Sequence, residues 1–252
     1  MTTAATFNFK GAVVMITGAS SGIGLRIAER CADVEATVIA CDIAEPPQRR
    51  ADTEYRRLDV KSEADWESVM ADCLRLHGKL DALVNCAGII VMGNIVDTPL
   101  PSFKEMMAVN VDGTFLGNKH AMKAMLPTGT GSIVNFSSSA GIAGSPGASG
   151  YCASKGAVRL LTKSVALEAI EAGTRIRVNS IHPGLTDSPM VDSIVNQLGG
   201  SPEIRSSLKS LVPGGRLAET NQIADAALFL VSDQSSFING SEFVVDNGFT
   251  AR

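Results

Sequence analysis

The chain lacks the segments that mark membrane and secreted proteins. No run approaches the roughly 18 unbroken apolar residues that a membrane-spanning helix requires. Residues 1–10 contain no basic run followed by an apolar stretch of the kind found in a signal peptide. We therefore expect a cytoplasmic protein with no membrane partner.

The chain also lacks an excess of charge of either sign. It has 22 basic and 26 acidic residues, which gives a formal net charge of -4. Nucleic-acid-binding domains usually carry a concentrated basic surface, which this composition does not suggest. We therefore expect a small-molecule partner and no nucleic acid.

Cysteine and histidine are few, and neither type is spaced as a metal site or disulfide framework. The five cysteines form no C-x-x-C pair, and the three histidines have no partners at ligand spacing. We expect free, buried thiols and no metal. Cys152 alone lies beside the chemistry considered below, and we interpret it as a tolerated small side chain, not a nucleophile. The residues are Cys31, Cys41, Cys73, Cys86, Cys152, His77, His120 and His182.

What the chain does contain is a regular alternation of short β-rich runs and longer helical patterns. This alternation is typical of an α/β protein, a doubly wound Rossmann-type domain with helices on both faces of a parallel sheet. No repeat or linker divides the chain, so we predict a single dinucleotide-binding and catalytic domain over residues 1–252. The expected strands are residues 12–16, 36–41, 55–58, 81–85, 132–136, 175–181 and 243–245.

Two stretches have no clear helical or strand pattern. Residues 140–149 are small and glycine-rich, and they predict a loop. Residues 186–213 are irregular, and we predict a substrate lid there. Apolar side chains in the lid favour a hydrophobic or alicyclic substrate, but the packing of a helix would produce the same pattern.

A glycine-rich turn follows the first strand and opens the first helix. Glycines at 18, 22 and 24 would let a pyrophosphate approach the backbone N–H groups of the helix start. Asp42 ends the second strand, where a carboxylate binds the adenosine ribose hydroxyls and repels a 2'-phosphate. We therefore predict NAD(H) in preference to NADP(H), unless Arg49 and Arg50 fold back toward the site. The predicted contacts in the turn are Gly18, Ser20, Ser21, Gly22, Ile23 and Gly24.

Tyr151 and Lys155 are four residues apart in a long helical pattern, so both side chains lie on one face of that helix. Taken alone, such a pair could be an ordinary surface feature. Its company favours chemistry: a serine cluster ends the fifth strand upstream, and a Pro-Gly turn ends the sixth strand downstream.

Together these motifs resemble the classical short-chain dehydrogenase/reductase family, over about residues 11–249. The residues that carry the resemblance are the glycine turn, Asn85-x-Ala87-Gly88, Asn110, Ser138, Tyr151-x-x-x-Lys155 and Pro183-Gly184. The resemblance implies a seven-stranded parallel sheet and a homotetramer. It further implies cofactor contacts at Asp59, Val60, Asn85, Ala87, Gly88, Pro183, Gly184 and either Thr186 or Ser188.

The resemblance also implies a mechanism for interconverting a secondary alcohol and a ketone. Tyr151 would be the general acid and base, and Lys155 would lower its pKa and hold the nicotinamide ribose. Ser138 would bind the substrate oxygen, although Ser137 and Ser139 are close alternatives. Asn110 would anchor a water chain from Lys155, unless it is simply a helix-interior side chain satisfied by the backbone.

Two departures and two rival functions accompany this interpretation. The entry to the second strand, residues 31–36, lacks the family's usual glycine, and Asn247 stands where glycine is common. A 3-oxoacyl reductase of lipid synthesis is one rival, but it normally uses NADPH, which Asp42 disfavours. A non-catalytic NAD(H) sensor is the other, and it would not need Asn110, Ser138, Tyr151 and Lys155 together.

Overall fold

The computed structural model describes residues 7–251, so the first six residues and Arg252 of the predicted domain lie outside the described residues. The seven strands form one parallel sheet in the order β3-β2-β1-β4-β5-β6-β7. The strands are β1 (Val13–Thr17), β2 (Thr37–Asp42), β3 (Thr53–Arg57), β4 (Ala82–Asn85), β5 (Thr130–Phe136), β6 (Arg175–Pro183) and β7 (Glu242–Val245). The predicted seven-stranded Rossmann sheet is confirmed, with strand ends within about two residues of those expected.

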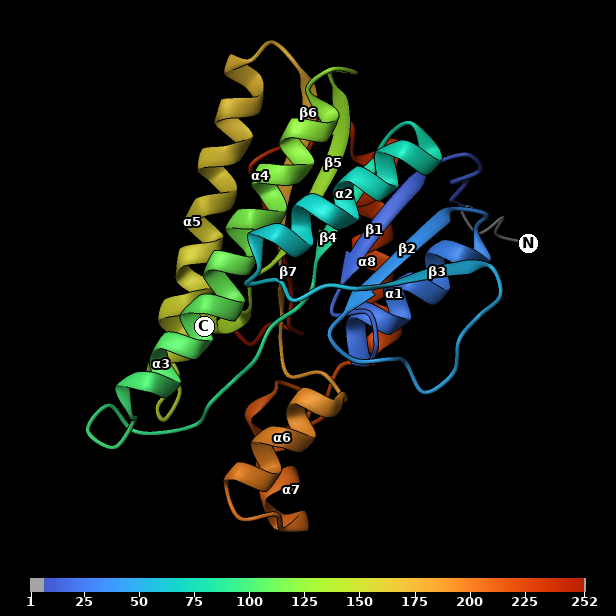
Figure 1. Cartoon of the computed structure of the whole chain (residues 1–252). Coiled ribbons are helices and arrows are strands. Elements are labelled where there is room, and N and C mark those ends of the chain that lie inside the picture. The colour runs from blue at the N-terminus through green and yellow to red at the C-terminus, as the bar shows by residue number, and fades with distance from the viewer. Residues whose placement is uncertain (1–6, 252) are drawn as a thin grey trace.

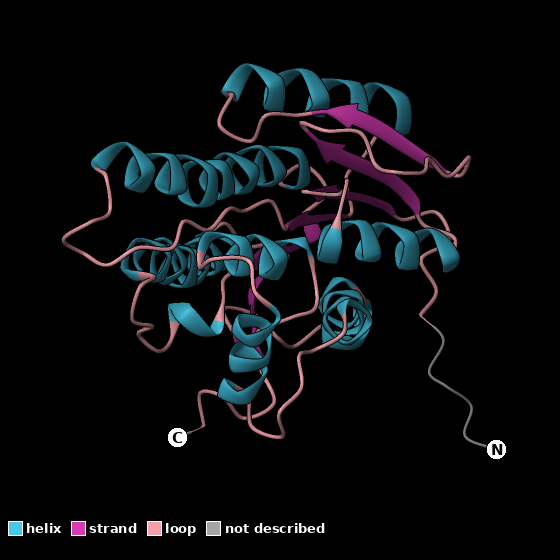
Figure 2. Ribbon diagram, turned by 90° about the horizontal axis from the view of Figure 1, so that it is seen from below, coloured by secondary structure: helices cyan, strands magenta, loops and turns pink. Residues whose placement is uncertain are grey.

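Helices cover both faces of this sheet, as Figures 1 and 2 show. The α-helices are α1 (Gly22–Asp33), α2 (Glu63–His77), α3 (Leu100–Met107), α4 (Gly113–Met125), α5 (Ser149–Glu171), α6 (Pro189–Gln197), α7 (Pro202–Leu211) and α8 (Thr220–Val231). A π-helical turn, η1 (Ala108–Asp112), joins α3 to α4, and 3-10 turns occur at η2 (Ser139–Gly141) and η3 (Asp233–Ser235).

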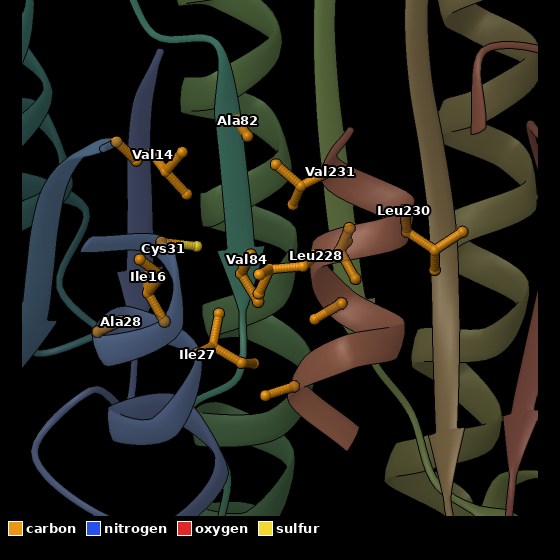
Figure 3. Packing of buried hydrophobic residues seen from close by; sticks show 14 of the residues in the cluster. Val14, Ile16, Ile27, Ala28, Cys31, Ala82, Val84, Leu228, Leu230 and Val231 are labelled. Atoms are coloured by element: carbon orange, nitrogen blue, oxygen red, sulfur yellow. The ribbon is translucent and has the colours of Figure 1, made fainter. Parts of the chain in front are cut away.

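Alternate side chains of each central strand point to opposite faces of the sheet and so build two cores. Val14 and Ile16 of β1 pack with α1 and α8, as Figure 3 shows. Val13 and Met15 point the other way, into a cluster shared with α2, α4 and α5. Because both faces are covered, the central strands β1, β2 and β4 are mostly apolar.

The two ends of α2 carry a capping serine and a terminating glycine. The Ser62 hydroxyl accepts a hydrogen bond from Asp65 N at 3.2 Å at the start of α2, and Gly78 ends that helix with a φ of 74°. Among the described residues, no helix is long and apolar enough to cross a lipid bilayer.

The prediction that residues 186–213 are irregular is wrong, because the segment forms α6 and α7. Each of these helices begins with a serine followed by proline, a pair suited to the first helical turn. Gly199 and Gly200, with φ values of 121° and 76°, turn the chain between the helices. Figure 1 shows this helical pair projecting from the carboxyl-terminal end of the sheet, where the predicted lid would lie.

Candidate active site

The glycine turn lies at the carboxyl end of β1, where the strand order reverses between β1 and β4. Side chains would not fit at two of its glycines. A Cβ on Gly24 would lie 2.1 Å from Gly18 O, and a Cβ on Gly18 would lie 2.8 Å from Ala87 Cα. The Thr17 hydroxyl accepts hydrogen bonds from Cys86 N and Ala87 N, each at 3.2 Å, and so ties the ends of β1 and β4 together.

The start of α1 is suited to an anion. Ser21 is the N-cap residue, but its side chain makes no capping hydrogen bond, and the first turn contains no acidic residue. The N–H groups of the first turn therefore have no side-chain acceptor, and the helix dipole favours negative charge there. With the close-packed glycines, this arrangement fits the pyrophosphate of a dinucleotide.

Asp42 ends β2 beside this turn, as predicted. Its carboxylate accepts hydrogen bonds from Ser20 N at 3.0 Å and Ala44 N at 3.1 Å. It lines a pocket that also includes Ser20, Tyr55 and Arg56. A ribose-binding carboxylate would occupy such a position.

Arg49 and Arg50, which could have bound a 2'-phosphate, both form ion pairs with carboxylates. Arg49 pairs with Glu45 at 2.5 Å, and Arg50 pairs with Asp33 at 2.9 Å and Asp52 at 2.8 Å. Neither guanidinium is free of an acidic partner.

Asn85 ends β4, but its side chain points into the protein. Its Nδ2 donates to Asn135 Oδ1 at 2.8 Å, and Asn135 exchanges hydrogen bonds with Asn118 and donates to Thr162. Any contact between Asn85 and a cofactor would therefore involve its backbone. The sequence analysis missed this buried amide network, although an asparagine inside a strand as apolar as β5 is a visible signal for it.

Asn110 is fully buried in the π-helical turn η1. Its side chain accepts from Ile89 N at 2.8 Å, and donates to Ile89 O at 2.9 Å and to Ser154 Oγ at 3.0 Å. Gly88 lies against it, since a Cβ there would be 3.2 Å from Asn110 Oδ1 and 3.3 Å from Lys155 Nζ. The side chain therefore holds the segment after β4 beside Lys155.

The three consecutive serines after β5 have different surroundings. Ser137 is buried and donates to Lys155 O at 2.8 Å, and Ser139 is buried at the start of η2. Ser138 is hydrogen-bonded to Tyr151, and its hydroxyl also accepts from Ala140 N at 3.1 Å. Of the three, Ser138 is the serine placed beside the phenol.

His182, for which the sequence predicts no metal-binding role, supports this serine. His182 Nδ1 lies 3.1 Å from Ser138 O, and its Nε2 lies 2.8 Å from Ser180 Oγ. Burial lowers the pKa of His182, so the ring is neutral at pH 7. The proximity of His182 to Ser138 could be found only from the pairing of β5 with β6.

Tyr151 and Lys155 lie near the start of α5, and both are buried, with 8% and 3% of their surface exposed. Lys155 Nζ lies 5.7 Å from the centre of the Tyr151 ring and donates to Phe136 O at 2.8 Å. The two predicted polar groups thus share one face of the helix, beneath the carboxyl end of the sheet.

The expectation that Lys155 lowers the pKa of Tyr151 is wrong for the protein without a cofactor. Burial raises the pKa of Tyr151 to about 12, and the hydrogen bond with Ser138 opposes this only in part. Burial also lowers the pKa of Lys155 to about 8. At pH 7 the amine is therefore still mostly protonated, although it loses its proton more readily than an ordinary lysine, and the phenol beside it is fully protonated. The cost of burying each charged form exceeds their mutual attraction.

An apolar wall borders the Tyr151 hydroxyl. It comes chiefly from residues 89–92 after β4, with Met106, Ala140, Cys152 and Met190. The Met190 Sδ lies 3.9 Å from Tyr151 Oη. Residues 89–92 were not predicted to line the site, although four consecutive apolar residues just after the Asn-x-Ala-Gly motif are a usable signal.

The lid is apolar mainly for its own packing. Val191, Val195, Leu208 and their neighbours form a separate small core between α6, α7 and the chain that follows. Met190 is the lid residue that joins the apolar wall around Tyr151. The alternative of ordinary helical packing therefore accounts for most of the lid pattern.

The remaining predicted cofactor residues surround the same edge. Thr186 is buried and donates to Gly184 O at 3.0 Å, and Ser188 donates to Thr186 O at 3.1 Å. A Cβ on Gly22 would lie 3.6 Å from Ser188 Cβ, so the start of α6 lies over the glycine turn. Asp59 and Val60 follow β3, and Val60 packs against Gly113 of α4. Pro183 ends β6.

The five thiols are free, and Cys31, Cys41 and Cys73 are buried as expected. Cys86 and Cys152 are only partly buried, which corrects the expectation for these two. No group of three or more histidine, cysteine or acidic side chains is arranged to hold a metal within residues 7–251.

Comparison with known proteins places these features in context. A family model described as enoyl-(acyl carrier protein) reductase matches residues 18–250. A cyclopentanol dehydrogenase of Comamonas sp. (strain NCIMB 9872) is 40% identical over 248 residues, which cover 95% of this chain and 97% of the relative. An NADP-dependent (R)-specific alcohol dehydrogenase of Lentilactobacillus kefiri is 36% identical, over 98% of this chain and all of the relative. The structure of levodione reductase superposes with a TM-score of 0.91 at 30% identity, over 97% of this chain and 99% of that one.

Proposed function

Because this chain belongs to the short-chain dehydrogenase/reductase family, we propose that it is an NAD(H)-dependent alcohol dehydrogenase or ketone reductase acting on a hydrophobic or alicyclic secondary alcohol and its ketone. The observation that carries the proposal is the grouping of Ser138 with the buried Tyr151 and Lys155, beside a glycine turn suited to a pyrophosphate. The nicotinamide, when bound, supplies or accepts the hydride.

The protein's own groups handle the oxygen and its proton. A ketone oxygen gains negative charge as the hydride adds, so it must receive a proton and a hydrogen bond. Tyr151, whose pKa is raised to about 12, carries its proton at neutral pH and is placed to donate it. Ser138 donates a hydrogen bond to the same oxygen, and His182 fixes the Ser138 backbone. In the reverse direction Tyr151 must first release its own proton, and the resulting phenolate then accepts the proton of the alcohol.

Lys155 and Asn110 complete the proposed site. Lys155 Nζ lies against Gly88 and is positioned to hold the nicotinamide ribose hydroxyls. Asn110 fixes the segment after β4 next to it, and its place in a π-helical turn is typical of functional positions. We assign Asn110 the anchoring of a water chain through which Lys155 replaces the proton of Tyr151.

The cofactor preference rests on Asp42. Its carboxylate lies by the glycine turn, and Arg49 and Arg50 are paired with acidic side chains. The pocket residues Arg56 and Arg57 are paired with Glu54 and Asp65, so each of these four arginines already has an acidic partner. One relative is NADP-dependent by name, so family membership does not decide between the two cofactors. Thr186 and Ser188 flank the same edge, with Ser188 closer to the glycine turn.

The substrate preference rests on the wall of the pocket. Tyr151 packs in a cluster of apolar side chains that includes residues 89–92, Met106 and Met190. A cyclopentanol dehydrogenase among the relatives agrees with an uncharged alicyclic substrate.

We also propose a homotetramer. Exposed apolar side chains gather on α4 and α5, including Phe115, Leu160 and Leu167, and such residues are usually covered in an oligomer. Light scattering after size-exclusion chromatography measures the mass directly. A monomer at micromolar concentration would contradict the assembly.

A substrate panel tests the function. Cyclopentanol, cyclohexanol and linear secondary alcohols are each incubated with the enzyme and NAD+ or NADP+, and reduced nicotinamide is followed by absorbance. We expect turnover with NAD+ and a higher kcat/KM for the cyclic alcohols. NADH binding without turnover on any alcohol or ketone would favour the sensor function instead.

A further inference from the structure

The apolar wall formed by residues 89–92 is a loop whose position depends on side chains from two other elements. Its backbone takes no part in the sheet, and after it Gly93 N donates to Gly147 O at 2.7 Å. A pocket wall made of loop backbone must be held by hydrogen bonds, because it has no ladder of its own.

The Ile89 end of this wall is held by Asn110 of the π-helical turn η1. Asn110 binds both the N–H and the C=O of Ile89, and Asn110 is itself fully buried. The position of Ile89 therefore does not depend on the lid helices α6 and α7.

The other side is held by the last residue of the lid helix α6. Gln197 Oε1 accepts from Met92 N at 2.9 Å, and Gln197 Nε2 donates to Ile90 O at 3.2 Å and to Ser193 Oγ at 3.0 Å. A carboxamide supplies the acceptor and the donor together, which neither a carboxylate nor an apolar side chain can do.

We propose that Gln197 is a positioning residue that latches the lid to the Ile89–Met92 wall and so sets the fit of the substrate pocket. The latch joins two parts of the apolar cluster around Tyr151: Met190 at the start of α6, and residues 89–92. Gln197 is exposed and does not take part in the apolar cluster, so its effect on substrate passes through the wall. The role in substrate binding rests on the function proposed above.

The test compares Gln197→Met, which keeps length but removes both hydrogen bonds, with Asn196→Met, a neighbouring exposed side chain with no hydrogen bond to the wall. Amide hydrogen exchange gives a readout independent of activity. In Gln197→Met the Met92 amide should exchange about tenfold faster or more, while the Ile89 amide, held by Asn110, should not change.

Kinetics then measures the consequence for substrate. We expect KM for cyclopentanol to rise about 3–10-fold in Gln197→Met with kcat within about twofold, because a loosened wall weakens binding without moving Tyr151 or Ser138. NADH affinity should be unchanged, since the latch lies away from the glycine turn. Asn196→Met should behave like the wild type.

The outcomes separate the two proposals. If the wild type turns over alcohols but Gln197→Met leaves the Met92 amide or KM unchanged, or if Asn196→Met raises KM equally, the latch is overturned and the reaction stands. If the wild type turns over no alcohol, the proposed reaction fails and the substrate role of Gln197 fails with it, while the exchange data still report whether the contact forms.

Discussion

Lys155 Nζ lies 5.7 Å from the centre of the Tyr151 ring, yet its hydrogen bond goes to the main-chain oxygen of Phe136 at 2.8 Å. The ammonium is therefore held by the end of β5 and not by the phenol. Its position beside Gly88 leaves it available to a ligand at the carboxyl end of the sheet. Both side chains are therefore placed to contact a bound ligand. Their protonation states in the free protein differ from those expected when cofactor and substrate are bound.

Replacement of Tyr151 by phenylalanine should remove most of the activity and leave the fold intact. The hydroxyl is the proposed proton donor, and loss of a general acid typically costs about 10²–10⁴-fold in rate. Steady-state kinetics checks kcat, and NADH fluorescence checks that cofactor binding persists. Tyr55→Phe is a control for the loss of a phenol hydroxyl. Tyr55 lines the pocket beside Asp42 and its hydroxyl accepts a hydrogen bond from Arg50 N, so we expect this change to affect the KM for the cofactor and to leave kcat near the wild-type value. Activity near the wild-type level in Tyr151→Phe would refute the mechanism.

Lys155 should make the stability of the cofactor-free protein rise with pH above about 8. Its pKa is lowered by burial from 10.5 to about 8, so between these values the unfolded chain binds more protons than the folded protein. Stability therefore increases with pH through that window, and below about pH 8 the burial of the ammonium costs about 3 kcal/mol.

Urea unfolding of wild type and Lys155→Met at pH 7, 8, 9 and 10 measures this. We expect the stability of the wild type relative to Lys155→Met to improve as the pH rises. Ionisation of other groups cancels in the comparison. A constant difference across the series would show that Lys155 is not desolvated as its burial indicates.

Removal of the Asp42 carboxylate should shift the cofactor preference. In Asp42→Ser the ribose hydroxyls lose their acceptor and a 2'-phosphate meets less repulsion, so the ratio of kcat/KM for NAD+ over NADP+ should fall about 10–100-fold. Asp52→Asn serves as control, since that carboxylate pairs with Arg50 and does not line the pocket. If Asp42→Ser leaves the ratio as it was, the preference is set elsewhere.

Arg177 should be important for stability and not for chemistry. This buried guanidinium donates to Leu230 O at 2.8 Å, Ser235 Oγ at 2.6 Å, Ser232 O at 3.1 Å and Val231 O at 3.3 Å, and so caps the end of α8. Arg177→Met would remove these four hydrogen bonds, although Leu230 O and Ser232 O keep hydrogen bonds from serine hydroxyls, and it should cost about 2–4 kcal/mol in the free energy of unfolding. Arg175→Met, on an exposed position of the same strand, should change it by less than about 0.5 kcal/mol. Equal effects would contradict the capping role.

The two positions that depart from the family's glycines should respond differently to glycine. Glu35 and Asn247 have φ values of 65° and 53°, a region that favours glycine and tolerates asparagine. Glu35→Gly should therefore raise the free energy of unfolding by about 0.5–1 kcal/mol. Asn247→Gly should give no gain, because it also loses the hydrogen bond from Asn247 Nδ2 to Pro213 O. Thermal unfolding of the two variants measures both changes in stability. Destabilisation by Glu35→Gly would mean that the contacts of the Glu35 side chain contribute more to stability than the strain of its backbone costs.

The fold could be predicted from the sequence because its signals are local. Apolar runs of strand length, the Ser62 cap and the glycines of the first turn each specify structure within a few residues. The same local reading missed α6 and α7, although both begin with Ser-Pro, because the apolar residues between 186 and 213 are interrupted by glycine and polar residues. Short helices give a weak periodic signal and take most of their stability from packing.

The sequence by itself determined which residue types are present and in what order: the glycine turn, Asp42, the serines before the tyrosine helix, and Tyr151 with Lys155 one helical turn apart. These features depend only on the order and spacing of residues, which can be read directly from the sequence. Only the tertiary structure decided the environments. It buried the phenol and the ammonium enough to move their pKa values apart, placed His182 behind Ser138, turned Asn85 inward, and brought Gln197 across to Ile90 and Met92. Desolvation and hydrogen bonds between distant segments depend on which surfaces pack together, and no local spacing contains that information.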